Sequence, residues 1–409
     1  MTIDEIIYTA VFSQDEKQKK DARKTILDIA RKQNIFPASI FPLYQAFGKD
    51  EASGFTVPAI NIRALTYDTA RIIFSLMKQN QIGPIIFEIA RSEMEYTAQR
   101  PQEYAVSVLA AAIKEDYQGP VFLQGDHFQL SKNRFLEDAE KEIQKIRDLA
   151  TEAIQAQFYN IDIDASTLVD LEKPDLSKQQ QANFEVTATL TKHIRNLEPE
   201  GVTIAIGGEI GHIGGKNSTV SDFTAFMEGY LPLIENPGIS KVSVQTGTSH
   251  GGVPLPDGTM ADVKLDFSVL QEIGKVAREN YGLGGAVQHG ASTLPQELFG
   301  EFVKAGTIEI HLATGFQNIV YETMPEALRN EMHQWTKDNC QKERENDWSD
   351  EQFVYKTRKK ALGPFKQKLW ELTEEQKEPI REKLRDQFAF LFEKLNVFNT
   401  RETLMRYIK

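Results

Sequence analysis

The feature that most constrains the fold is a regular alternation of short β-branched segments with longer segments of helical periodicity. Eight segments have the length and composition of buried strands: residues 57–62, 84–89, 121–124, 160–164, 202–206, 241–245, 285–288 and 308–312. The stretches between them, such as 67–79, 133–157 and 266–279, carry apolar residues at helical spacing. Because each parallel pair of strands needs its own crossover, this order predicts an α/β fold, a closed (β/α)8 TIM barrel. A doubly wound open sheet is the structural alternative.

The predicted barrel covers about residues 55–325 of the 409-residue chain, and helix-prone extensions flank it at 1–54 and 326–409. Phe365, Leu369, Trp370 and Phe388 recur in the second extension, which indicates that it docks against the barrel or against a neighbouring subunit. No linker rich in Gly, Ser or Pro and no internal repeat interrupts the sequence. We therefore expect one domain over residues 1–409, assembled as a homodimer or homotetramer.

Composition excludes several classes of function. The formal net charge is -12 and no block of basic residues occurs, so we expect neither a nucleic-acid nor an anionic-membrane partner, since both need clustered Lys and Arg. No apolar run approaches the roughly 18 residues of a membrane span. Cys340 is the only cysteine, which excludes an intrachain disulfide and a thiolate metal cluster. The first 20 residues lack a basic segment followed by an apolar one, so we expect a cytoplasmic protein.

Histidines stand at the ends of the predicted strands, where the reactive groups of a barrel lie. Of seven histidines in the chain, four occupy such positions: His127, His250, His289 and His311. A single histidine there is more often structural than a ligand. The first three, however, each lie within two residues of a glycine, which allows close approach of a ligand. Three imidazoles and an open position are the usual arrangement of catalytic zinc, so His127, His250 and His289 are the predicted metal ligands.

Acidic residues follow the same strands. Asp126 precedes His127, Asp162 and Asp164 close the fourth strand, and Glu209 follows the fifth. A carboxylate beside a metal-bound carbonyl could act as general acid and base. The alternative for each is a helix N-cap or a residue that orients a metal ligand.

Glycine-rich turns follow three late strands, at residues 251–252, 290–292 and 314–315. Backbone N–H groups of the last loops commonly bind a phosphate in barrels, so these turns are candidate phosphate sites.

Six segments, in order from about residue 55 to 325, together resemble one known family. They are VPAINIRALTYDTARIIF, GDHF, IDIDAS, EIGHIGG, QTGTSHG and QHGASTLP. The chain is similar in these segments to the class II fructose-bisphosphate and tagatose-bisphosphate aldolases.

The resemblance implies a role for each matching residue. His127, His250 and His289 would bind one catalytic Zn²⁺, Glu209 would ligate or support it, and Asp164 would lie near a second metal position. Asp126 would be the catalytic acid and base. The triose phosphate would be held by Gly251, Gly290, Ser292 and Thr314. The implied activity is that of a glycolytic carbon–carbon lyase, which cleaves fructose 1,6-bisphosphate to dihydroxyacetone phosphate and glyceraldehyde 3-phosphate through a metal-stabilised enediolate.

The sequence departs from the family at residues expected to meet the substrate. His311 stands where the family has an asparagine that contacts the triose, and Ala90 replaces a serine that helps to bind the far phosphate. Lys216 and Asn217 replace an acidic pair. Arg358 matches the arginine that serves the far phosphate.

These departures leave alternatives to the default substrate. One is the same metal and enediolate chemistry on another ketose phosphate, a free ketose or a sugar acid, by an aldolase or an epimerase. Another is a non-catalytic family member. A Schiff-base aldolase would need a desolvated lysine at the end of a strand, whereas Lys241 begins its strand.

Overall fold

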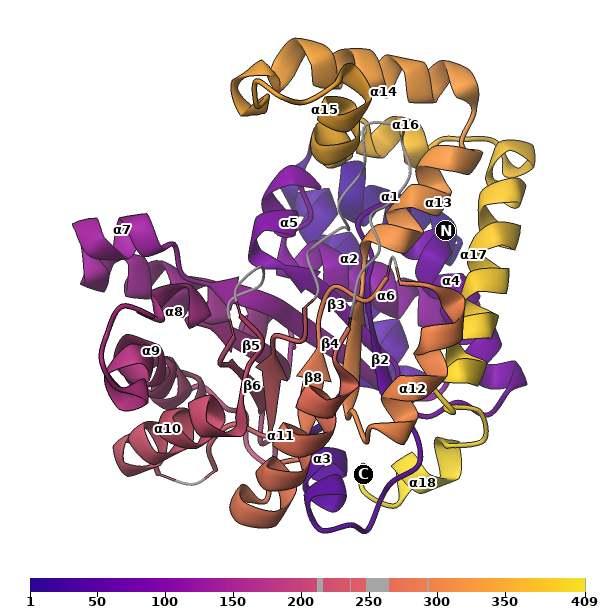
Figure 1. Ribbon diagram of the computed structural model, residues 1–409. Coiled ribbons are helices and arrows are strands. Elements are labelled where there is room, and N and C mark those ends of the chain that lie inside the picture. Colours follow the sequence, from indigo (N-terminus) through magenta and orange to yellow (C-terminus); the bar gives the residue numbers. More distant parts are fainter. Residues whose placement is uncertain (212–215, 236, 248–264, 293, 409) are drawn as a thin grey trace.

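The structure is a computed structural model that describes residues 1–211, 216–235, 237–247, 265–292 and 294–408. Its strands are β1 (Ile35–Pro37), β2 (Val57–Asn61), β3 (Ile86–Ala90), β4 (Gly119–Gln129), β5 (Asn160–Asp164), β6 (Ala205–Glu209), β7 (Lys241–Val244), β8 (Ala286–Gln288) and β9 (Glu309–Leu312). Strands β2 to β9 pair in parallel in the order of the chain, and β9 pairs with β2, so the sheet is closed. The predicted (β/α)8 barrel is confirmed, and the open sheet is excluded (Figure 1).

Helices alternate with the strands and surround them (Figure 1). Those of the barrel and of the first extension are α1 (Ile3–Phe12), α2 (Glu16–Lys32), α3 (Phe41–Gly48), α4 (Thr66–Gln79), α5 (Arg91–Tyr96), α6 (Pro101–Lys114), α7 (Lys132–Glu137), α8 (Ala139–Gln155), η1 (Ser166–Leu168), α9 (Leu176–Arg195), α10 (Val220–Tyr230), η2 (Leu231–Leu233), α11 (Phe267–Tyr281), η3 (Gln296–Leu298), α12 (Phe299–Lys304) and α13 (Thr314–Thr323). The second extension forms α14 (Glu326–Asn339), η4 (Gln341–Glu343), α15 (Asp350–Thr357), η5 (Arg358–Ala361), α16 (Lys366–Trp370), α17 (Glu374–Lys394) and α18 (Arg401–Met405).

Two predicted elements differ in their bounds. The helix expected over 133–157 is divided into α7 and α8 at Asp138, whose backbone is extended and whose side chain accepts a hydrogen bond from the Lys141 N–H. An extended residue that caps the following helix ends the preceding one. The strand expected at 202–206 lies at 205–209, so Glu209 is the last residue of β6 rather than a loop residue.

The C-terminal extension packs on the barrel helices. Phe388 of α17 contacts Phe316 of α13 with ring centroids 4.6 Å apart. Arg381 of α17 forms a buried ion pair with Asp68 of α4. These contacts hold α17 along the side of the barrel, whereas α14 and α15 lie together beyond it, at the top of Figure 1.

Among the described residues, no helix combines the length and the apolar character that a membrane crossing requires.

Candidate active site

A bulge in β4 places two consecutive side chains at the barrel mouth. The pairing of β4 with β5 shifts register between Gly125 and Phe128, and His127 adopts a φ of 41°. Successive residues of a regular strand face opposite sides, whereas a bulge changes the direction of a side chain. Asp126 and His127 therefore both line the same cavity.

Beside this bulge, two imidazoles and a carboxylate from three strands converge. The His127 Nδ1 atom lies 3.2 Å from Glu209 Oε2, and His289 Nδ1 lies 3.6 Å from Glu209 Oε1. The two rings have centroids 4.2 Å apart. One potential ligand atom from each of His127, Glu209 and His289 lies within 4.8 Å of the others. His250 and Gly251, which the sequence placed here as well, lie outside the described residues.

This donor set fits a borderline divalent cation, because imidazole nitrogen and carboxylate oxygen are the ligands that such ions take. Asp164 lies beside it, with its Oδ2 atom 3.1 Å from the same His127 Nδ1 atom that approaches Glu209. Burial raises the pKa of Asp164, but its hydrogen bonds to His127, Ser166 and Gln129 outweigh that effect and hold the pKa well below the ordinary value. An ionised carboxylate at this distance orients the imidazole ring.

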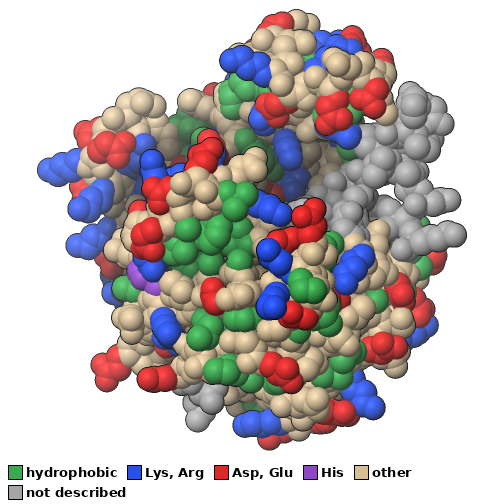
Figure 2. Space-filling model, turned by 60° about the vertical axis from the view of Figure 1, so that its left-hand side comes forward, with side chains coloured by type: hydrophobic (Ala, Val, Ile, Leu, Met, Phe, Trp, Pro, Cys, Tyr) green, Lys and Arg blue, Asp and Glu red, His purple; other side chains and the backbone are tan. Residues whose placement is uncertain are grey.

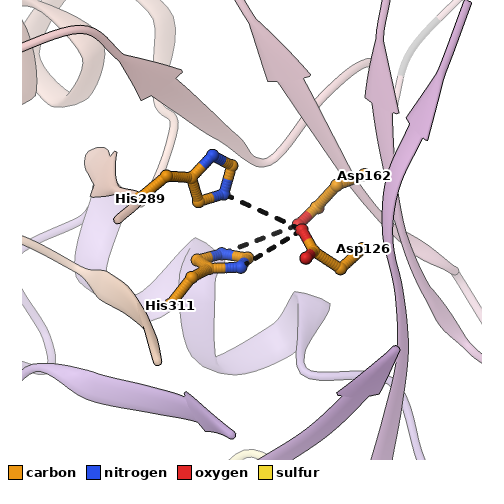
Figure 3. Close-up of side chains that lie close together, drawn as sticks. All are labelled: Asp126, Asp162, His289 and His311. Carbon is orange, nitrogen blue, oxygen red and sulfur yellow. Dashed lines mark ion pairs between the residues drawn. The ribbon is translucent and has the colours of Figure 1, made fainter. Parts of the chain in front are cut away.

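A second cluster lies deeper in the barrel and consists of Asp126, Asp162, His289 and His311 (Figure 3). The Asp126 Oδ1 atom is 3.3 Å from His311 Nδ1, 3.9 Å from His289 Nε2 and 4.0 Å from His127 Nε2. Burial raises the pKa of Asp126, yet the three imidazoles together hold it well below its usual range. Asp126 is thus an ionised carboxylate surrounded by imidazoles.

Beneath Asp126 the barrel interior is charged rather than apolar. Lys241 is completely buried, and its Nζ atom lies 3.0 Å from Asp162, 2.9 Å from Gln124 Oε1 and in contact with Glu309. His311 Nδ1 lies 2.9 Å from Glu88 Oε2, and its Nε2 lies 2.6 Å from Glu309 Oε1. Beneath Asp126, three buried carboxylates (Glu88, Asp162 and Glu309) therefore face the ammonium of Lys241 and the imidazole of His311 among the described residues.

These acids determine the charge of both bases. Burial lowers the pKa of Lys241, but Asp162 and Glu309 raise it overall. A Schiff-base lysine needs a lowered pKa, so Lys241 does not have that character. Burial also lowers the pKa of His311, but Glu88, Asp126 and Glu309 raise it well above the ordinary value.

A cavity of about 440 Å³ opens above the two clusters. It is lined by four of the residues predicted to bind substrate or phosphate, Gly290, Ser292, His311 and Thr314, and by Ala90. Thr314 is the first residue of α13. A helix N-terminus presents free backbone N–H groups, which suit a phosphate.

Basic side chains surround the mouth of the cavity: Arg63, Arg91, Arg134 and Lys359. Figure 2 shows a recess between the upper helices and the barrel with Lys and Arg side chains along it. Arg63 is held in place, because its Nε atom donates to Glu93 Oε1 at 2.7 Å and its Nη1 atom donates to Thr314 Oγ1 at 3.2 Å. The sequence reasoning missed Arg63, although its place two residues after β2 was a usable signal.

Two residues singled out in the sequence lie elsewhere. Arg358 does not line the cavity; its Nη2 atom donates to Asn318 Oδ1 at 2.7 Å, and its guanidinium lies against Tyr321 and Tyr355. The next residue, Lys359, lines the cavity instead, because the tight η5 turn directs consecutive side chains apart. Lys216 lies 3.5 Å from Asp222, beside a separate, smaller pocket.

Similarity to known proteins extends over most of the chain. The family model described as "Fructose-bisphosphate aldolase class-II" matches residues 42–382. Among solved structures, a probable tagatose 6 phosphate kinase from Sinorhizobium meliloti 1021 is 14% identical with a TM-score of 0.56, over 86% of this chain and 93% of that one. A fructose-bisphosphate aldolase from Campylobacter jejuni is 18% identical with a TM-score of 0.52, over 88% and 96%. At such identities the likeness shows the fold. A search of curated proteins finds no match.

Proposed function

Because this chain belongs to the class II fructose-bisphosphate aldolase family, it is an aldolase-type lyase, and we propose that its substrate is a ketose phosphate, by default fructose 1,6-bisphosphate. The products would be dihydroxyacetone phosphate and glyceraldehyde 3-phosphate. The observation that carries the proposal is the Asp126 carboxylate, which lies among three imidazoles at the closed end of a cavity with a basic mouth.

We assign His127, His250 and His289 as ligands of a catalytic Zn²⁺, with Glu209 beside them. The described members of this set lie close enough to share one ion. A divalent cation bound there supplies a Lewis acid, which polarises the ketose carbonyl and stabilises the charge left when the adjacent carbon–carbon bond breaks.

Asp126 is the catalytic acid and base in this proposal. As an ionised carboxylate it can accept the hydroxyl proton of the substrate during cleavage and return it during condensation. The contact with His311 holds the carboxylate at the floor of the cavity. Gly290, Ser292 and Thr314, together with Gly251, would bind the phosphate of the triose half.

A second candidate keeps this chemistry but changes the sugar to a monophosphate, a free ketose or a sugar acid. Two observations favour it: Arg358, the match for the far-phosphate arginine, points away from the cavity, and His311 places an imidazole where the family has an amide. Turnover of the bisphosphate, the monophosphate and the free ketose, measured side by side on one preparation, separates the two candidates. Equal turnover without the distal phosphate would remove fructose 1,6-bisphosphate as the default.

The assignment of Asp126 is tested by Asp126→Asn, which keeps the shape of the side chain and removes its basicity. We expect kcat to fall by roughly 10²–10⁴-fold while zinc content, measured by mass spectrometry of the metal, stays unchanged. Asp21→Asn, at an exposed carboxylate of α2, is the matched control and should have wild-type turnover. A wild-type rate in Asp126→Asn would discard the acid–base assignment.

A further inference from the structure

Glu88 lines the central cavity and leaves one carboxylate oxygen open. It belongs to β3 and is completely buried. Its Oε2 atom accepts a hydrogen bond from Gln124 Nε2 at 3.0 Å and lies 2.9 Å from His311 Nδ1. Its Oε1 atom is also buried and has no hydrogen-bond partner among the described residues. A buried acceptor without a donor costs free energy, so a ligand that donates to it is stabilised there.

The neighbouring strand presents a second open acceptor. Asn61 of β2 pairs in register with Glu88, so the two side chains leave the sheet on the same face, and both line the cavity. The Asn61 Nδ2 atom donates to Glu93, which leaves the amide oxygen as the free end of the side chain. This Oδ1 atom is buried and has no partner in the described part of the chain. Adjacent strands therefore offer two acceptors to a molecule that enters the cavity.

The donors beside Glu88 are already engaged. Gln124 Nε2 carries two protons, and its acceptors are Glu88 Oε2 and Glu309 Oε1, each at 3.0 Å. His311 Nδ1 carries at most one proton and faces Glu88 Oε2 and Asp126 Oδ1. Neither group has a further proton for Glu88 Oε1. A bound molecule with its own hydroxyl donor can complete this acceptor.

Glu88 lies close to the reacting carbon, because it shares a contact with Asp126. The His311 Nδ1 atom is 2.9 Å from Glu88 Oε2 and 3.3 Å from Asp126 Oδ1, so the two carboxylates flank one nitrogen. Under the proposed function, Asp126 takes the hydroxyl proton of the carbon that becomes the aldehyde. The carbons across the breaking bond belong to the half assigned to the metal ligands and to the turns after β8 and β9. The hydroxyl group on the next carbon of the aldehyde half is therefore the donor that Glu88 is placed to meet.

We propose that Glu88 determines which aldehyde the enzyme uses, by accepting a hydrogen bond from the hydroxyl group on the carbon next to the aldehyde carbonyl, with Asn61 as a second acceptor beside it. The assignment rests on the proposed function and specifies its substrate class, a 2-hydroxyaldehyde. A site with a buried acceptor for a substrate hydroxyl rejects the analogue that lacks this group, because the acceptor then stays unpaired.

The reaction in the condensation direction tests this specificity, with dihydroxyacetone phosphate as the fixed partner of two aldehydes. D-Glyceraldehyde 3-phosphate carries the hydroxyl group, and 3-phosphooxypropanal differs from it only by lacking that group. D-Glyceraldehyde and 3-hydroxypropanal repeat the comparison without the distal phosphate. Burial first, and then Asp126, raise the pKa of Glu88 to about 7 against the opposing effect of His311, so the assay is run at pH 8, where the carboxylate is mainly ionised. We expect the wild-type protein to favour the hydroxyaldehyde in kcat/KM by roughly 10–100-fold.

Two variants of Glu88 should reduce that preference. Glu88→Met removes the acceptor, and the ratio of the two kcat/KM values should fall to about one. In Glu88→Gln the amide oxygen has to face Gln124 and His311, so the NH₂ group replaces the open acceptor and the ratio should also fall. Glu309→Gln is the matched control, because Glu309 is equally buried and contacts His311 but does not line the cavity. Its absolute rates can change, whereas its ratio should stay at the wild-type value.

Each ratio compares two aldehydes on one preparation, so a general loss of packing lowers both rates and leaves the ratio unaffected. If Glu88→Met does not fold, Glu88→Gln alone decides the test. Equal kcat/KM for both aldehydes in the wild type, an unchanged ratio in the Glu88 variants, or the same fall in Glu309→Gln would overturn the role of Glu88 and leave the proposed function standing. Absence of condensation with every aldehyde would overturn the proposed function, and the role of Glu88 with it.

Discussion

Replacing Lys241 by methionine tests whether the charged barrel interior holds the fold together. Methionine keeps much of the length and volume of the lysine side chain but removes the ammonium group. Asp162 and Glu309 would then remain buried beside an apolar group, with Gln124 as an uncharged neighbour and His311 as the remaining cation beside them among the described residues. A buried carboxylate that loses its partner retains its full desolvation cost.

The magnitude follows from the distances. At 3.0 Å and an effective dielectric constant of about 20, one unit-charge pair such as Lys241–Asp162 is worth about 5.5 kcal/mol before desolvation is subtracted. Lys241 touches a second carboxylate, Glu309, as well. Removing one partner of a buried pair costs about 3–5 kcal/mol in practice. We therefore expect Lys241→Met to lower the free energy of unfolding by about 4 kcal/mol at pH 8.

The loss should depend on pH with a defined sign. In the native protein burial raises the pKa of Glu309, but Lys241 and His311 lower it overall, below its ordinary value of 4.5. Without the ammonium, His311 alone opposes the effect of burial, so we expect the pKa of Glu309 in the folded state to rise above 4.5. A carboxylate with a raised folded pKa destabilises the protein above its unfolded pKa, and protonation relieves that cost as the pH falls. The destabilisation should therefore be larger at pH 8 than at pH 5.

Urea unfolding followed by circular dichroism at both pH values measures the effect. Glu309→Gln added to Lys241→Met should recover part of the loss, because it removes one of the two carboxylates that lost their lysine partner. Lys275→Met is the control, since Lys275 is exposed and its pair with Glu279 at 3.9 Å should contribute less than about 1 kcal/mol. A loss below about 1 kcal/mol in Lys241→Met, or a larger loss at pH 5 than at pH 8, would refute the electrostatic account.

Two further predictions concern the metal and the phosphate loop. Treatment with a chelator should abolish turnover and lower the melting temperature, and added Zn²⁺ should restore both, because a ligand that binds only the folded state stabilises it. Mass spectrometry checks that the metal has been removed completely. Turnover that survives this removal would contradict the metal assignment. Gly315→Ala should raise KM for the phosphorylated substrate, because a β-carbon there would lie 2.5 Å from the Ser292 carbonyl oxygen and would displace the 290–292 loop. Gly300→Ala, where the β-carbon meets open space, is the matched control. Equal KM values in the two variants would show that the close approach of residue 315 to Ser292 is unimportant for substrate binding.

The barrel could be predicted from the sequence because its signals are local. Each strand is a short β-branched run, and each crossover has its own helical periodicity. The displaced bounds of β6 show the limit of that argument. The apolar run at 202–206 suggested the strand, whereas the structure continues it through Gly207 and Gly208, which pair with Lys241 and Val242. Gly207 is needed there because a β-carbon would collide with the Asp162 carboxylate.

The sequence could locate the candidate site only where its residues stand at the ends of predicted strands. His127, His289 and Glu209 come from different strands, and the closed sheet brings them within reach of one ion. Arg358 and Lys359 show that a motif match cannot determine which of two adjacent side chains faces the cavity. The two are adjacent and both basic, and only the rotation of the η5 turn decides which one faces the cavity. That rotation depends on the packing of Arg358 between two tyrosines from α13 and α15, which no local pattern records.

His311 gains a physical explanation from the charges beneath it. A neutral imidazole has one N–H, yet His311 places Nδ1 2.9 Å from Glu88 and Nε2 2.6 Å from Glu309. Both contacts are favourable ion pairs only if the ring is protonated, and the raised pKa of His311 agrees with that state. An asparagine at this position could donate to one acid but would add no charge, and the acids of this layer would then depend on Lys241 alone. The departure from the family at residue 311 is therefore coupled to the acidic interior of this barrel, so an account of its substrate preference has to include Glu88 and Glu309 as well as the residues that touch the sugar.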